Sequence, residues 1–238
     1  VSALTLQAEM IIISEDDLRV TEGELSALCA SLGLKLPTER VRFWIERTEG
    51  NAMVLNLLIR RLQQGEQDGD ALAEDVRRAF MDYLDEQIIS DWSRGVQTFL
   101  MQLSLVDAFT PELAQAVTGD DDVTLLLSRA EQVGNIFSCT GGEWRIRPVL
   151  LETLRRRAVR SFGQRRCNQL MYNAGRYYEL SGQTLRALAI YRQCDEEDGI
   201  FSLLVREARK HAGVGNYWAL RQYYQALSDA DIQREPVQ

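Results

Sequence analysis

Histidine and cysteine are scarce in this sequence, which argues against most metal and triad chemistry. Its 238 residues include one His and four Cys. Cys29, Cys139, Cys167 and Cys194 lie far apart, without the close spacing that zinc ligands need, so we expect each to be a reduced core or surface residue. His211 has no Ser or Cys nearby with an acid partner in sequence, so we expect no catalytic triad. The sequence therefore predicts a protein that is not an enzyme.

Long apolar runs and an excess of positive charge are also missing. Runs such as residues 10–13 fall far short of the roughly 20 residues of a membrane span, and no basic and apolar leader opens the chain. We therefore expect a cytoplasmic protein without membrane contact. The net charge of −8 argues against a chain whose main work is to coat nucleic acid, which requires a basic surface.

Proline and glycine are few, with 4 and 16 residues, and apolar residues recur at spacings of three and four. This period is typical of amphipathic helices that pack on one another, so the predicted fold is mainly α. Met10–Ile13 is the early exception, because a β-branched run favours a strand, and Ser14–Asp17 should form the turn after it. Thr21 and Glu24 have the spacing of a capping box, which predicts a helix from there to Gly33.

We expect three parts along the chain. Residues 1–70 should hold a small helical unit, with a helix from Pro37-Thr38, another through Met53–Leu62 and a loop at residues 63–69. A long helix from about Leu72 to Ile89 then opens a second part, residues 71–162. Residues 163–238 should form the third part, a run of helical hairpins.

The second part has the pattern of a winged helix. A helix at residues 93–105, one capped by Thr110 before Pro111, and one capped by Asp122 are followed by two short strands, Asn135–Cys139 and Trp144–Arg147. A helix that contacts DNA must carry hydrogen-bond donors for phosphates and base edges. Asp120–Asp122 precede the third helix, which offers only Arg129 against Glu131, so we do not expect this part to bind DNA.

The third part resembles a tetratricopeptide repeat. Gly175, Tyr178, Gly182, Ala187 and Tyr191 have its offsets, with small residues where two helices cross and aromatic residues between them. Such a helix pair must stack on a neighbour. Residues 200–224 are helical in pattern but repeat the signature poorly, so we interpret them as a degenerate second repeat.

Taken in order, these segments resemble the middle region of the large ATP-binding LuxR-type transcriptional regulators, a group of signal transduction ATPases that includes the bacterial maltose-regulon activator. Residues 13–21 are similar to the end of the family's nucleotide-binding core, and residues 46–52 to the element that closes its lid over nucleotide, with Asn51 in place of the family's usual Trp. Residues 143–150 lie where the family has an aromatic-x-aromatic-His-Pro-Leu-Phe pattern. Arg147 replaces this His, which in related ATPases can sense the nucleotide phosphates, and is our candidate nucleotide sensor.

The resemblance implies parts that this sequence does not contain. No Gly-x-x-x-x-Gly-Lys-[Ser/Thr] loop is present to cradle a triphosphate, so the chain itself should need no cofactor, and ATP or ADP should bind the upstream nucleotide-binding core of the full-length parent. DNA contact would come only through the family's C-terminal helix-turn-helix. The repeats would receive an inducer or a protein partner.

Two functions follow, and both are non-enzymatic. In the first, the chain is the lid, winged-helix and first-repeat segment of such a regulator. In the second, it is an independent helical adaptor that binds a protein partner through its repeats.

One dense basic run has three interpretations, since it could contact nucleic acid, meet an acidic neighbouring domain or simply remain solvated. It comprises Arg155, Arg156, Arg157, Arg160, Arg165 and Arg166.

Two further features favour ordinary structural roles. Asp195–Asp198 should be a solvated loop, because it lacks the glycine and the alternating ligands of a calcium site. Trp44, Trp92, Trp144 and Trp218 are spread one to a unit, which fits core or interface anchors better than a platform on which nucleic-acid bases stack.

Overall fold

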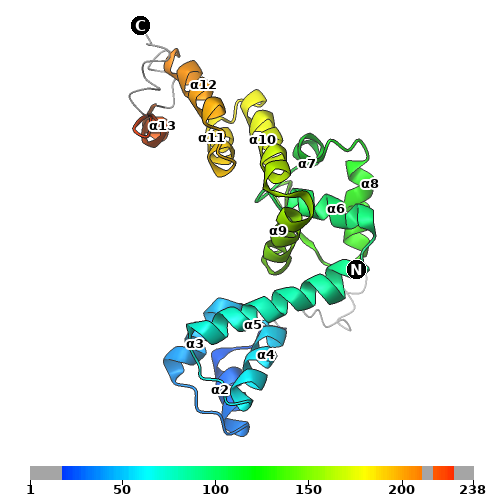
Figure 1. The fold of residues 1–238 in the computed structure, drawn as a ribbon, viewed down its shortest axis with the longest axis vertical. Coiled ribbons are helices and arrows are strands. Elements are labelled where there is room, and N and C mark those ends of the chain that lie inside the picture. Colours follow the sequence, from blue (N-terminus) through cyan, green and yellow to red (C-terminus); the bar gives the residue numbers. More distant parts are fainter. Residues whose placement is uncertain (1–17, 211–216, 228–238) are drawn as a thin grey trace, which may run out of the picture. The chain divides into compact units, whose positions relative to one another are not determined.

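The computed structural model describes residues 18–210 and 217–227, which are mainly helical with one short antiparallel hairpin (Figure 1). The predicted fold class is thus confirmed. The strand predicted at residues 10–13, the turn at 14–17 and His211 lie outside the described residues. Within the described part, no helix is long and apolar enough to cross a membrane. Contacts divide the chain into two compact units between Tyr83 and Leu84.

In its described residues, 18–83, the first unit is a bundle of four helices with one apolar core. Its helices are α2 (Glu22–Ser31), α3 (Thr38–Thr48), α4 (Ala52–Gln63) and α5 (Asp70–Tyr83). Each buries apolar residues spaced by three or four, as the sequence pattern predicts. The core contains Leu25, Cys29, Val41, Trp44, Val54, Leu55, Leu58, Ile59, Leu72, Ala73 and Val76.

The start of α2 is the predicted capping box. The Glu24 backbone N–H donates to Thr21 Oγ1 at 3.3 Å, and the Thr21 N–H donates to Glu24 Oε2 at 2.8 Å. These bonds satisfy two backbone donors that would otherwise lack partners at a helix start. They also lower the pKa of Glu24, chiefly through the bond from the Thr21 backbone.

Asn51 has a local structural role at the start of α4. Its side-chain oxygen accepts hydrogen bonds from the backbone N–H groups of Met53 and Val54, at 3.0 and 3.2 Å. Asn51 is therefore the N-cap of α4, and Asn is among the residues most favoured at that position.

Replacing Asn51 by Ala should therefore destabilise the first unit. The loss of a side-chain cap typically costs about 1 kcal/mol, and urea denaturation of the Asn51→Ala chain should show it. An Asn51→Asp variant, which keeps an acceptor oxygen, should remain within about 0.5 kcal/mol of wild type. Equal destabilisation by both changes would contradict the capping role.

Asp68 fixes the loop between α4 and α5. Its carboxylate accepts from Arg40 Nε at 2.7 Å, from Arg40 Nη2 at 2.9 Å and from Trp44 Nε1 at 2.9 Å. The bond from Arg40 is the main reason that the pKa of Asp68 is lowered. The predicted loop at residues 63–69 is present, and this one side chain attaches it to α3.

The helix predicted from about Leu72 to Ile89 changes character at the unit boundary. α5 ends at Tyr83, and a short π-helix, η2 (Leu84–Ile88), and a 3-10 turn, η3 (Ile89–Asp91), follow it. The apolar face of α5 packs on α4 with the core of the first unit. For this reason the contact boundary falls after Tyr83.

After η2 and η3, the second unit continues with three helices, a hairpin and a fourth helix. In chain order these are α6 (Arg94–Leu103), α7 (Pro111–Thr118), α8 (Val123–Gln132), β1 (Phe137–Thr140), β2 (Glu143–Ile146) and α9 (Pro148–Phe162). Ser93 and Thr110 cap α6 and α7 with their side chains. Asp122 stands at the N-cap of α8 but makes no side-chain cap bond.

The hairpin register differs slightly from the predicted strands. β1 pairs with β2 from Phe137↔Ile146 to Thr140↔Glu143, so the turn is only Gly141-Gly142. Both glycines have positive φ angles, 61° and 82°, as tight hairpin turns require. A bridge that the sequence did not reveal joins Phe109 to Trp144, with N···O distances of 2.9 and 2.8 Å.

The remaining helices form hairpins. They are α10 (Gln164–Leu180), α11 (Thr184–Gln193), α12 (Glu197–Ala208) and α13 (Tyr217–Tyr224). Gly163 alone separates α9 from α10, and its φ of 77° with ψ of 157° is a conformation open essentially to glycine. α10 packs against α7, α9 and α11, and α11 packs against α12.

Candidate functional site

Arg147 lies between β2 and α9 and is the N-cap residue of α9. Its backbone N–H donates to Ile136 O at 2.9 Å, and its carbonyl accepts from Leu150 and Leu151. The side chain is half-buried. The hairpin and α9 thus fix the backbone from which this guanidinium projects, whereas its role toward nucleotide remains a prediction.

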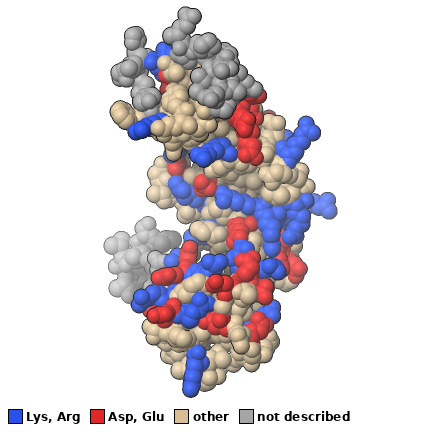
Figure 2. Space-filling view, turned by 60° about the vertical axis from the view of Figure 1, so that its left-hand side comes forward, with Lys and Arg blue, Asp and Glu red and all other residues tan. Residues whose placement is uncertain are grey.

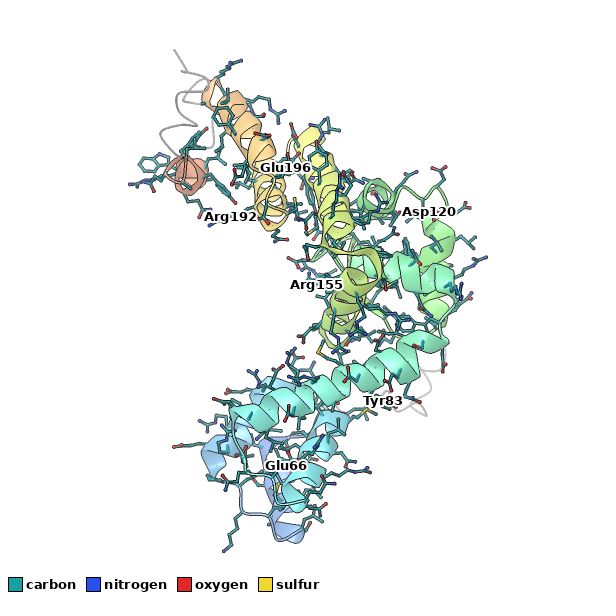
Figure 3. The ribbon with its side chains drawn as sticks, viewed as in Figure 1. Glu66, Tyr83, Asp120, Arg155, Arg192 and Glu196 are labelled. Atoms are coloured by element: carbon teal, nitrogen blue, oxygen red, sulfur yellow. The ribbon has the colours of Figure 1, made fainter. Side chains whose placement is uncertain are left out.

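Charged side chains of both signs surround the third helix of the winged-helix part. Asp120, labelled in Figure 3, lies in the acidic turn before α8, where its carboxylate accepts from the Asp122 N–H at 3.0 Å. Arg129 and Glu131 are both exposed on the helix. Basic and acidic side chains also lie side by side over much of the face shown in Figure 2, so that face is not an unbroken basic surface.

The arginines of the basic run do not share one environment. Arg155 donates to Ser104 O at 2.6 Å and to Asp107 Oδ1 at 2.8 Å, so it attaches α9 to the end of α6. Arg165 and Arg166, in the first turn of α10, are exposed. Part of the run therefore holds the winged-helix part together, and part faces solvent.

Two other arginines of the basic run form ion pairs with the same carboxylate. Arg157 and Arg160 both form ion pairs with Asp85 of η2, and Arg157 also donates to Gln97 Oε1 at 2.9 Å and to Ser90 Oγ at 3.3 Å. The side chains of Asp85 and Arg157 are 14% and 22% exposed. This cluster anchors the π-helix to α9, and no local sequence signal identifies it, because its members come from four segments.

The hairpin also contacts the first repeat. Glu143 of β2 accepts from Arg186 of α11 at 2.8 Å, and the Arg186 guanidinium lies 5.6 Å from the centre of the Tyr178 ring. Burial raises the pKa of Tyr178. Together with the packing of α10 on α7, these contacts join the winged-helix part to the repeat hairpin.

The residues that carry the repeat pattern meet as predicted. Tyr191 is fully buried against Gly175, where an added Cβ would lie 2.4 Å from Tyr191 Cε1. The Tyr191 hydroxyl donates to Glu179 Oε2 at 2.6 Å, and burial is the main cause of the raised pKa of Tyr191. Ala187 is likewise fully buried. The helices α10 and α11 thus cross at small residues around one aromatic ring.

Glu179 is the hub of a polar cluster that the sequence pattern did not reveal. Arg176 Nη1 donates to it at 3.1 Å and Arg206 Nη1 of α12 at 2.9 Å. Burial by itself would raise the pKa of Glu179, but the Tyr191 hydrogen bond and the two arginines together lower it. Glu179 therefore connects α10, α11 and α12.

The cysteines and the tryptophans differ in their exposure to solvent. Cys139 is exposed, and the other three cysteines are buried and free. Among the described residues, no group of His, Cys, Asp and Glu could hold a metal ion. Trp44 and Trp92 are buried and Trp144 is half-buried, but Trp218 on α13 is 80% exposed, so it is not a core residue.

The hairpin, its bridge to Phe109 and the three helices define a winged-helix domain. Residues 85–166 match the family model of the MalT winged helix domain. This match begins directly after the unit boundary and ends in the first turn of α10. It confirms, over these residues, the resemblance to regulators of the MalT type that the sequence indicated.

A solved structure also resembles the chain. It is a signal transduction ATPase with numerous domains (STAND) protein with a tetratricopeptide repeat sensor from Pyrococcus horikoshii, at a TM-score of 0.48 and 15% sequence identity. The alignment covers 92% of this chain and 31% of that protein, so the chain spans less than a third of its length. No curated protein matches the sequence.

Proposed function

We propose that this chain is the signal-coupling segment of a cytoplasmic, ATP-dependent transcriptional regulator of the LuxR type, and that it is not itself an enzyme. The observation that carries the proposal is the match of residues 85–166 to the MalT winged helix domain, together with the repeat hairpin that Gly163 joins to the last helix of this domain, α9. The Glu143–Arg186 ion pair links the same two parts a second time.

The mechanism that we propose is a shift between two conformations. An inducer or protein partner on the repeats would change the contacts between α10–α11 and the winged helix. A nucleotide-binding core outside this sequence would hold ATP or ADP and favour one conformation, and DNA would be bound by a separate C-terminal domain. A ligand shifts such an equilibrium only by its difference in affinity for the two states.

Arg147 is the residue of this chain that we assign to the nucleotide. A guanidinium presents five N–H donors in a planar fork that suits phosphate oxygens.

The test uses the parent protein, extended upstream to include its nucleotide-binding core. We expect wild type to bind ADP in calorimetry and Arg147→Ala to bind it at least tenfold more weakly. Arg129→Ala, which removes an exposed arginine from α8, should leave binding unchanged. If wild type binds no nucleotide, the regulator proposal fails and the independent adaptor replaces it, whereas equal binding by both variants removes only the assignment of Arg147.

A further inference from the structure

A pocket lies beside the hairpin of the winged helix, where α8 ends. Its volume is about 410 Å³, which is within the range of sites that hold small organic molecules. The end of α8, the loop before β1 and one face of the hairpin line it. Among its lining residues are Glu131, Ile136, Phe137, Cys139 and Trp144. We call this space the hairpin pocket.

The pairing of the two strands decides which side chains face the hairpin pocket. Cys139 is paired directly with Trp144, so their side chains are on the same face of the hairpin. Phe137 is on this face too, because it lies two residues before Cys139. Ser138 and Arg145, the neighbouring pair, are on the other face. Arg145 therefore points away from the pocket.

Trp144 and Phe137 form a fixed aromatic wall. Their rings meet edge to face, with 5.6 Å between centroids and 86° between planes, and Phe137 packs in the same manner on Phe109 at 5.8 Å. The bridge to Phe109 holds the Trp144 backbone, yet the Trp144 side chain is only half-buried. Trp is the aromatic residue whose ring face attracts a cation most strongly, so this wall suits a positively charged group.

The charge at the hairpin pocket is negative. Of the described residues that line it, Glu131 alone is charged, and it is exposed. α8 ends one residue later, at Gln132, so the last carbonyl groups of this helix, the negative end of its dipole, lie at the same place. Arg129 precedes Glu131 by two residues, which is about 200° round the helix. It therefore points to the other side of α8.

We propose that the hairpin pocket binds a small organic cation, a primary ammonium group on an apolar body. The ammonium would contact the Glu131 carboxylate and the Trp144 ring, with the body against Ile136 and Phe137. Glu131 would repel an anion, and a neutral molecule would gain neither the charge-assisted hydrogen bond nor the cation–π contact. The inference goes beyond the proposed function, because it gives the winged helix a ligand of its own, and ADP binding does not test it.

Cys139 makes occupancy of the hairpin pocket measurable. It lines the pocket and is exposed, whereas the other three cysteines are buried. Alkylation of the 238-residue chain by uncharged iodoacetamide, followed by mass spectrometry, should therefore modify Cys139 first. We expect 2-phenylethylammonium to slow this reaction in a saturable manner. 2-Phenylethanol should need at least tenfold higher concentration for the same effect, and phenylacetate should have none.

Two variants separate the role of Glu131 from a general loss of negative charge. Glu131→Gln should abolish the preference for the ammonium over the alcohol and leave the effect of the alcohol unchanged. Asp121→Asn removes an exposed carboxylate from the turn before the same helix and should keep the preference. Each rate is compared with that of the same variant without ligand. Unreactive Cys29, Cys167 and Cys194 would show that the variant remains folded.

A lysine side chain of a protein offers the same ammonium group, so an acetylated peptide with a single lysine is the alternative ligand. Protection of Cys139 by 2-phenylethylammonium that loses its preference only in Glu131→Gln supports the proposal. The proposal is overturned if the peptide protects at lower concentration than the small ammonium, or if the alcohol or phenylacetate protects equally well. It is also overturned if Glu131→Gln keeps the preference or Asp121→Asn loses it.

Discussion

The Asp85→Asn variant should lose roughly 3 kcal/mol of the free energy of unfolding of the second unit. Asp85 is the carboxylate on which Arg157 and Arg160 converge. Its removal leaves the largely buried Arg157 guanidinium without its anion, and breaking one partner of a buried ion pair typically costs 3–5 kcal/mol. We take the lower end because Arg157 keeps the hydrogen bond to Gln97. Urea denaturation followed by circular dichroism measures the change.

Asp107→Asn is the matched control. Asp107 also pairs with an arginine of α9, Arg155, at 2.8 Å, but its side chain is 74% exposed. Exposed ion pairs contribute little, so we expect a change below about 0.5 kcal/mol. Equal effects of the two substitutions would show that Asp85 acts as an ordinary surface charge.

Gly175→Ala should destabilise the repeat hairpin by about 3 kcal/mol, at the upper end of typical overpacking costs. The new methyl group would lie 2.4 Å from Tyr191 Cε1. The ring cannot easily move away, because it is fully buried and its hydroxyl is bonded to Glu179. Thermal unfolding monitored through tyrosine absorbance should show a lower transition temperature.

Gly95→Ala, in the same unit, should have the opposite effect on stability. Gly95 lies in α6, and nothing is within 4 Å of a Cβ added there. Alanine in a helix is favoured over glycine by roughly 0.5–1 kcal/mol, so this variant should be slightly more stable. A loss of stability from Gly95→Ala, or none from Gly175→Ala, would contradict the packing argument.

Features encoded by neighbouring residues were predictable from the sequence. Three such features depend on a few nearby positions each. They are the capping box at Thr21, the Thr110-Pro111 helix start, and the spacing of Gly175 and Tyr191. The helical fold class and the winged helix follow from such signals taken in order. Local hydrogen bonds and helix periodicity need no knowledge of distant contacts.

Features that join distant segments were not predictable. Three contacts connect residues that are far apart in the sequence. They are the Phe109–Trp144 bridge, the hydrogen bonds from α3 to Asp68, and the Asp85 cluster. The basic run illustrates this, since its identical arginines have different partners on different sides of α9. Neighbours on a helix face directions about 100° apart, so adjacent residues rarely share a role.

The single glycine between α9 and α10 is a short joint, and any rotation there would have to change the packing of α10 on α7. α10 has 17 residues, so at 1.5 Å per residue it extends about 25 Å from Gly163. If the joint turned by about 10°, the far end of α10 would move by about 4 Å, a displacement comparable to the rise of one helical turn. A longer flexible linker would absorb such a rotation, whereas a one-residue joint transmits it to the whole length of α10.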